Sequence, residues 1–152
     1  MAQKAMIPRV FLDACAWLAF LGRPAGGTGE ILRLAREGRI CILSSEPILE
    51  EVRKHLARVK RTPVDLAMIL REIPRKDVSP SVADIERVPE EIEPKDRHVI
   101  AAAIRGQADY LVTFDRRHLA KPKTRERVSF PIETPRAFLE WFRAQHRLEG
   151  KP

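Results

Sequence analysis

Four acidic side chains lie far apart in the chain at positions where carboxylates could work together: Asp13, Glu51, Asp96 and Asp115. Two of them come after short apolar runs. Asp13 directly follows VFL, and Asp115 follows YLV after Thr113 and Phe114. Such runs are typical of buried strands, and a carboxylate beside a buried strand usually needs a partner or a cation. The pattern therefore suggests a shared acidic site.

Glu51 is chosen over its neighbour Glu50 by helical geometry. A helix is expected from Ser44 or Ser45 to about residue 59, and at ~100° per residue its apolar side chains form one arc. Glu50 falls on the far side of this arc and is expected to be solvated. Glu51 falls just outside the arc, where it can reach around the rim of the core.

Asp96 begins a helix expected over about 95–106 and shares its inner face with Ile100, Ala103 and Ile104. An acid in the first turn of a helix is commonly favoured by the macrodipole, but that role needs no particular face. Its place on the inner face favours a site role.

Four converging carboxylates would repel one another, because two unit charges ~4 Å apart cost about 4 kcal/mol at an effective dielectric constant of ~20. The simplest compensation is a hard divalent cation with oxygen ligands, Mg²⁺ or Mn²⁺. Such an ion can activate water and neutralise charge on a phosphodiester. Zinc is not expected, because Cys15 and Cys41 lack ligand spacing and are interpreted as buried free thiols.

The elements that must position these acids alternate between strands and helices. Strands are expected at about 9–13, 39–43, 110–113 and 128–132. Besides the helix from Ser44 or Ser45 to about 59, helices are expected at about 28–37, 63–73, 95–106 and 135–147. The segment 73–94, rich in proline and acid, is the least defined, and 115–127 is expected to be a basic loop. Near-continuous apolar strands in this order predict an α/β fold with a parallel sheet covered on both faces. Ligands of such sheets lie beyond the carboxyl ends of the strands, where Asp13 and Asp115 fall.

The 152 residues are enough for one domain with a substantial core, with loose tails expected at 1–6 and 148–152. No apolar run approaches the ~20 residues of a membrane-spanning helix, and the start lacks the apolar core of a signal peptide. A cytoplasmic protein is expected.

Positive charge favours a nucleic-acid partner. The formal net charge is +7 and the pI is about 9.9. Basic residues concentrate in 53–61 and 115–127, whereas 84–96 is acidic. In the second basic stretch the candidate phosphate contacts are Arg116, Arg117, Lys121 and Lys123. The histidines at 55, 98 and 118 are interpreted as surface or phosphate-contacting residues.

The segments VFLDACAW, SSEPILEEVRKHL and EPKDRHVIAAAIRGQADYLVTFDRRHL resemble the PIN domain family of metal-dependent nucleases, closest to the toxin components of toxin–antitoxin systems. The resemblance implies a doubly wound sheet of about five strands, Mg²⁺- or Mn²⁺-dependent cleavage of RNA, frequent dimerisation and inhibition by an antitoxin. It assigns the acidic positions to Asp13, Glu51, Asp96 and Asp115. Asp109 matches an acid often present before the last core strand, but it precedes that strand and so falls at its far end, which favours a turn or cap role.

One departure from the family concerns the two residues after Asp13, where a hydroxyl residue and often an asparagine are usual and this chain has Ala14 and Cys15. Loss of such supporting groups commonly costs 10–100-fold in metal affinity or activity. Thr113 could supply a hydroxyl instead. The alternative function is therefore a weakly active or inactive PIN-fold module that binds RNA or protein. A third function, a phosphatase with a nucleophilic aspartate, would require a second acid at position 15, and Cys15 argues against it.

Overall fold

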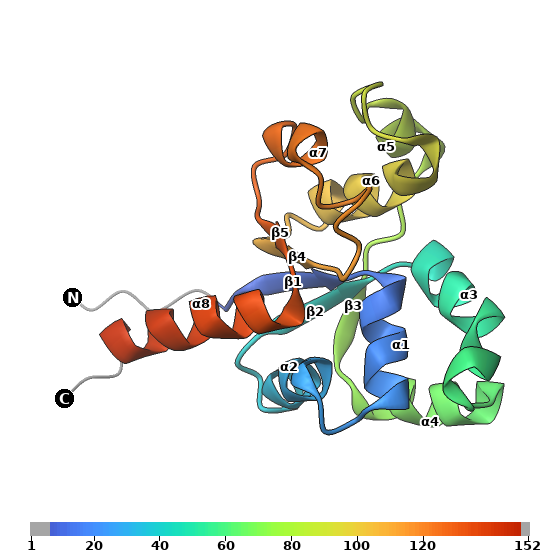
Figure 1. The fold of residues 1–152 in the computed structure, drawn as a ribbon, viewed down its shortest axis with the longest axis vertical. Coiled ribbons are helices and arrows are strands. Elements are labelled where there is room, and N and C mark those ends of the chain that lie inside the picture. Colours follow the sequence, from blue (N-terminus) through green and yellow to red (C-terminus); the bar gives the residue numbers. More distant parts are fainter. Residues whose placement is uncertain (1–6, 150–152) are drawn as a thin grey trace.

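The computed structural model describes residues 7–149, which form a five-stranded sheet with helices on both sides (Figure 1). All neighbouring strands are parallel, and their order is β3-β2-β1-β4-β5. The strands are β1 (Arg9–Leu12), β2 (Cys41–Ser44), β3 (Arg75–Asp77), β4 (Tyr110–Val112) and β5 (Ile132–Glu133). The predicted doubly wound α/β class with about five strands is confirmed.

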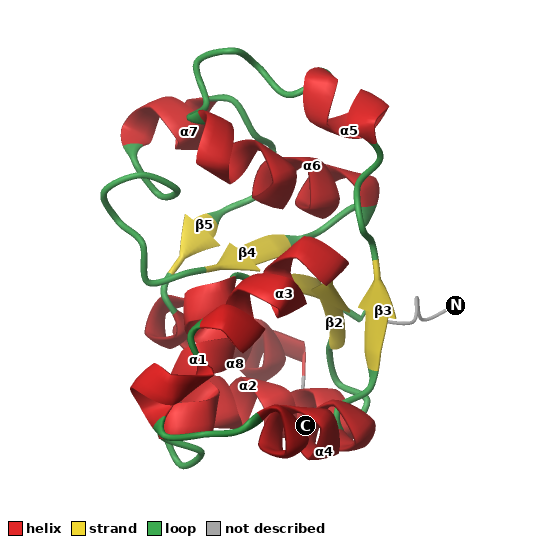
Figure 2. Ribbon diagram, turned by 90° about the vertical axis from the view of Figure 1, so that its right-hand side faces the viewer, coloured by secondary structure: helices red, strands yellow, loops and turns green. Residues whose placement is uncertain are grey.

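Helices α5, α6 and α7 cover one face of the sheet, and α1, α2 and α8 cover the other (Figure 2). The helices are α1 (Ala14–Gly22), α2 (Gly27–Arg36), α3 (Glu46–Lys54), α4 (Pro63–Glu72), α5 (Val82–Glu86), α6 (Arg97–Arg105), α7 (Pro122–Glu126) and α8 (Pro135–Glu149), with short 3₁₀ turns η1 (Leu56–Val59) and η2 (Pro94–Asp96). Between residues 7 and 149, no helix is both long and apolar enough to cross a membrane.

The central strand β1 organises the fold. Val10, Phe11 and Leu12 are completely buried, and Val10 pairs with Ile42 of β2 on one side and Tyr110 of β4 on the other. Strands buried on both faces need apolar side chains at successive positions, which explains the unbroken runs in the sequence. The pairing aligns the carboxyl ends of strands that are about a hundred residues apart in the chain.

Local signals define the start of α3. The Ser45 hydroxyl accepts a hydrogen bond from the Ile48 N–H, and a proline stands in the first turn. Ile48, Leu49 and Val52 are buried, as the periodicity predicts. The helix ends at Lys54, and the chain continues through η1, so the prediction of one helix to residue 59 was too long.

Other boundaries also differ from the predictions. The segment 73–94 contains β3 and α5, and the basic stretch expected to be a loop contains α7. The last strand is at 132–133 rather than 128–132. Ile104, expected on the inner face of α6, is 52% exposed.

Arg97, the first residue of α6, holds the acidic segment that precedes this helix. Its guanidinium donates hydrogen bonds to three backbone carbonyls, those of Ile85, Val88 and Pro89, at 2.7–3.0 Å. A guanidinium is well suited to this task because its donors form a planar fork. The segment before α6 is thereby tied to the residue that follows Asp96.

Candidate metal and nucleic-acid site

Asp13 lies directly after β1 and caps the start of α1. Its Oδ1 accepts a hydrogen bond from the Ala14 N–H at 2.8 Å. Its Oδ2 accepts one from the Thr113 hydroxyl at 2.8 Å and a longer one from the Cys15 thiol at 3.4 Å. The expected supporting hydroxyl of Thr113 therefore does contact Asp13, and three groups, from the start of α1 and from the loop after β4, fix the direction of this carboxylate.

Cys15 links the two loops that carry Asp13 and Asp115. Its sulfur accepts a hydrogen bond from the Phe114 N–H at 3.3 Å, while its thiol donates to Asp13. Burial, with the nearby charge of Asp13, raises the pKa of Cys15 to about 12. The thiol stays protonated near neutral pH and keeps its donor, so Cys15 takes over part of the role of the missing hydroxyl.

Cys15→Ala is expected to lower divalent-ion affinity and RNA cleavage about 10–100-fold, because Asp13 loses one of its orienting donors and Phe114 loses its acceptor. Cys15→Ser, which keeps a donor and an acceptor, is expected to retain most of both. Ion affinity measured by calorimetry and cleavage rates measured side by side check this. Equal losses in both variants would contradict a hydrogen-bonding role for position 15.

Asp115 is held by the backbone of the loop that follows β4. Its Oδ1 accepts hydrogen bonds from the N–H groups of Arg117 and His118 at 3.2 and 3.0 Å, and its own N–H donates to Thr113 Oγ1 at 3.0 Å. The His118 ring nitrogen Nδ1 lies 3.5 Å from the same Oδ1. Thr113 thus contacts both aspartates, Asp13 through its side-chain donor and Asp115 through its acceptor.

Asp96 is 8% exposed at the start of α6, on the inner face as predicted. Its side chain makes no capping hydrogen bond to α6, so the common helix-start role does not describe it. Burial raises the pKa of Asp96, Lys95 opposes this, and the charges of Asp115, Glu93 and Asp13 raise it further. Asp96 therefore lies close enough to Asp13 and Asp115 for their charges to disfavour its ionised form.

The pKa of Asp96 predicts how stability depends on pH without divalent ions. A raised pKa means that the folded state binds more protons than the unfolded state, so the contribution of Asp96 to the free energy of unfolding falls as pH rises above about 4. Asp96→Asn is expected to reduce this fall, which urea unfolding at several pH values can measure.

Asp65 provides a control of opposite sign. The backbone N–H of Thr62 lowers the pKa of Asp65 in the capping box of α4, so its contribution is lost as pH falls. Asp65→Asn should therefore reduce the loss of stability at low pH instead. If Asp96→Asn behaved in the same way, the sign assigned to Asp96 would be wrong.

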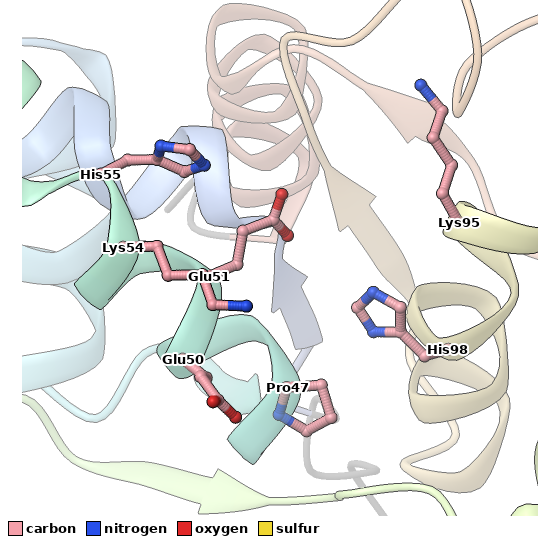
Figure 3. Close-up of a pocket in the computed structure, with 7 residues that line it drawn as sticks. All are labelled: Pro47, Glu50, Glu51, Lys54, His55, Lys95 and His98. Atoms are coloured by element: carbon pink, nitrogen blue, oxygen red, sulfur yellow. The ribbon is translucent and has the colours of Figure 1, made fainter.

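Glu51 projects from α3 into a cleft of about 450 Å³ between α3 and the start of α6 (Figure 3). Lys54 and His55 line the α3 side, and Lys95 and His98 line the opposite side. The Glu51 carboxylate points into this space, whereas the Glu50 carboxylate points away from Lys95 (Figure 3). This agrees with the choice of Glu51 from the helical periodicity.

His98 presents one ring nitrogen to the cleft. Its Nδ1 is buried without a hydrogen-bond partner in residues 7–149, which leaves Nε2 as the nitrogen available to solvent or a ligand. The Lys95 side chain extends to His118 and not to His98, and its Nζ lies 3.2 Å from Nδ1 of His118. The sequence analysis singled out neither Lys54 nor Lys95, and only the basic character of 53–61 could have pointed to Lys54.

The structure brings the acids to one side of the sheet but does not pack them into a finished ligand set. No group of three Asp, Glu, His or Cys side chains in the described part of the chain already has the spacing of a metal site. The donor set nevertheless fits a hard cation, because it consists of carboxylates and its most buried member, Asp96, is destabilised by its charged neighbours.

The basic residues of the loop after β4 differ in availability. Arg116, Arg117 and Lys123 are exposed, while Lys121 is half-buried and pairs with Glu93, with 3.2 Å between Lys121 Nζ and Glu93 Oε1. Free cations suit phosphate contacts better than paired ones. Of the four predicted contacts, Lys121 is therefore the one already used within the protein.

Asp109 lies at the opposite end of β4 from the other acids. Its Oδ2 accepts a hydrogen bond from the Arg9 N–H at 2.8 Å, and its own N–H donates to the Arg9 carbonyl at 2.7 Å. Asp109 thus ties the starts of β1 and β4 together. This is the turn or cap role, and the structure does not bring Asp109 to the other four acids.

An all-parallel sheet with acidic side chains at its carboxyl edge, carried by the loops after β1 and β4 and by helices on either side, defines a PIN-like α/β domain. A family model described as PIN domain matches residues 9–117, more than half of the chain. The chain belongs to the PIN domain family. No curated protein matches it.

Two solved structures have a similar fold. The structure of VapBC2 from Rickettsia felis, bound to a DNA fragment from its promoter, has a TM-score of 0.60 and 16% identity, covering 83% of this chain and 98% of that one. VapC20 from Mycobacterium tuberculosis, described as a Sarcin-Ricin loop cleaving toxin, has a TM-score of 0.50 and 18% identity, covering 73% and 93%. At these identities the likeness concerns the fold.

Proposed function

We propose that this protein is a metal-dependent endoribonuclease that hydrolyses phosphodiester bonds in RNA. The observation that carries the proposal is Asp96, a buried carboxylate raised in pKa by its burial and by the charges of Asp115 and Asp13. A buried carboxylate beside other carboxylates costs stability unless its charge is compensated, and such perturbed groups cluster at functional sites, where a bound cation can supply the compensation. Membership of the PIN domain family supports the same reading.

Asp13, Glu51, Asp96 and Asp115 would hold Mg²⁺ or Mn²⁺. The bound ion would supply an activated water and positive charge beside the phosphate. Around it, Thr113 orients Asp13 through its hydroxyl. The loop N–H groups after Asp115 engage its Oδ1, which restricts the directions in which this carboxylate can bind a ligand.

Two groups of basic side chains would hold the RNA backbone. The cleft beside Glu51 contributes Lys54 and His98, and the segment after β4, which contains α7, contributes exposed Arg116, Arg117 and Lys123. The two groups belong to different elements, so they would contact different phosphates of one strand. Backbone contacts of this kind are sequence-independent and weaken with salt.

Incubation of labelled RNA with the protein and Mg²⁺ or Mn²⁺ tests the proposal. Cleavage that needs the ion and stops on chelation supports it. RNA that is bound but never cut, with either ion, would favour the alternative of a non-catalytic RNA-binding module. Ala14 and Cys15 in place of the usual polar residues are the observation that favours this second candidate.

We further propose that the protein acts in the cytoplasm as the toxin of a type II toxin–antitoxin pair and forms a homodimer. One similar structure is that of VapBC2, and another is described as a Sarcin-Ricin loop cleaving toxin. Growth arrest on expression, relieved by co-expression of a small neighbouring gene, would support the toxin role. Harmless expression of an active nuclease would remove the toxin role and leave the nuclease. Light scattering would measure the oligomeric state.

A further inference from the structure

We propose that Phe114 is a stacking platform for an unpaired nucleobase, so that the site takes single-stranded RNA; this inference rests on the ribonuclease function proposed above. Phe114 is 48% exposed and is the only aromatic residue among the exposed large hydrophobic side chains of residues 7–149. Most other aromatic side chains are buried in the core, and Phe11 and Trp17 are completely so. An exposed flat ring is therefore kept at one place in the molecule, next to Asp115.

The backbone under this ring is unusually well held for a surface loop. The Phe114 N–H donates to Cys15 Sγ at 3.3 Å, the Thr113 N–H donates to the Glu133 carbonyl at 2.9 Å, and the Asp115 N–H donates to Thr113 Oγ1 at 3.0 Å. A group fixed before binding loses less conformational entropy when a ligand arrives. These bonds make Phe114 a platform rather than a mobile side chain on a free loop.

The neighbours of Phe114 match what a single strand needs. Asp115, a candidate ion ligand, follows it directly, and neighbouring Cα atoms are about 3.8 Å apart, so the exposed ring belongs to the residue next to the place where a phosphate would bind. Exposed Arg116 and Arg117 come next and can contact the following phosphate. Aromatic side chains combined with basic residues are how proteins bind single strands without reading sequence.

The chemistry of the contact selects the ligand class. A base can lie on a protein ring only when it is not stacked and paired within a helix. Duplex RNA offers its backbone to Arg116 and Arg117 but keeps its bases from Phe114. Loops, ends and unpaired segments are therefore the substrates that use the whole surface.

The test measures RNA binding by fluorescence anisotropy in the Asp96→Asn background, in which bound RNA stays intact. Phe114→Ala is expected to weaken binding of a short single strand roughly 5- to 100-fold. Phe114→Trp, which keeps a flat ring, should restore binding, whereas Phe114→Leu, which keeps apolar bulk alone, should not. Met68→Ala, at a 59% exposed apolar position on α4, is the control and should bind like the parent.

A second arm identifies the base that stacks. Single abasic nucleotides are placed in turn along the strand, and one position should weaken binding of the parent while having little effect on Phe114→Ala. Equal binding by Phe114→Ala and the parent, or equal abasic losses in both, would overturn the inference. If the wild-type protein cuts RNA but substitution of Phe114 has no effect on binding, the stacking inference fails and the nuclease function is supported. If Phe114 couples to one base but the wild-type protein cuts no RNA, the stacking inference is supported and the nuclease function fails.

Discussion

Asp96→Asn and Asp13→Asn are each expected to lower metal-dependent RNA cleavage by more than about 100-fold, beyond the 10–100-fold typical of groups that merely support a ligand. Each substitution removes a negative charge and a ligand oxygen from a site that needs both. Glu51→Gln is expected to have a similar effect. Initial cleavage rates at saturating ion and RNA, with circular dichroism to verify folding, measure the losses.

Glu50→Gln is the matched control for Glu51→Gln. The two residues are adjacent on α3 and both line the cleft, but the Glu51 carboxylate points toward the start of α6 and the Glu50 carboxylate points away from it (Figure 3). Glu50→Gln is expected to cleave RNA at nearly the wild-type rate. If both substitutions reduced cleavage equally, general loss of charge on α3 would explain the result, and the assignment of Glu51 would fail.

Gly29→Ala is expected to destabilise the protein by about 3 kcal/mol or more, at the upper end of the range for overpacked positions. A Cβ atom at Gly29 would lie 1.8 Å from the Pro24 carbonyl oxygen and 2.8 Å from its carbon. Both contacts are with backbone, so relief requires moving the turn that leads into α2. The free energy of unfolding from urea titration measures the effect.

Gly27→Ala tests the same helix start without the clash. Its Cβ would meet only ordinary contacts, the nearest being Pro135 Cβ at 3.6 Å. The substitution should change the free energy of unfolding by less than about 1 kcal/mol, since alanine also favours helical backbone. A large loss in both variants would mean that the start of α2 needs glycine for backbone freedom rather than for space at Gly29.

Strands with buried side chains could be predicted from the sequence, and an edge strand could not. Val10–Leu12 and Tyr110–Val112 are apolar at every position because helices cover both faces. β3 has the sequence RKD and all three residues are exposed, so it carries no hydrophobic signal and is defined by its pairing with β2. Its existence depends on tertiary context.

Helix faces were predictable where a helix packs along its whole length. Asp96 and Ile100 are buried as the periodicity indicates, but Ile104 lies near the end of α6, just before Gly106, and is half exposed. Periodicity assigns a face but does not show how far the covering layer extends. The same limit explains why the apolar periodicity predicted one helix to residue 59, although α3 ends at Lys54 and η1 follows it.

For the candidate site, the sequence predicted which acids face inward but not the bonds that hold them. The bridge from Cys15 to both Asp13 and Phe114 joins residues about a hundred positions apart, and no local pattern reports it. The cleft beside Glu51 likewise needs Lys95 and His98 from a distant helix. Contacts between elements depend on the order of strands in the sheet.

The pairing of β1 with β4 has a consequence for synthesis of the protein. Asp13 is translated early, but the strand that brings Asp115 beside it is translated about a hundred residues later. A chain still emerging from the ribosome has neither Thr113 to orient Asp13 nor the loop of Asp115. The proposed RNA-cutting site therefore cannot assemble on a chain that stops before β4, so its assembly is tied to nearly complete synthesis.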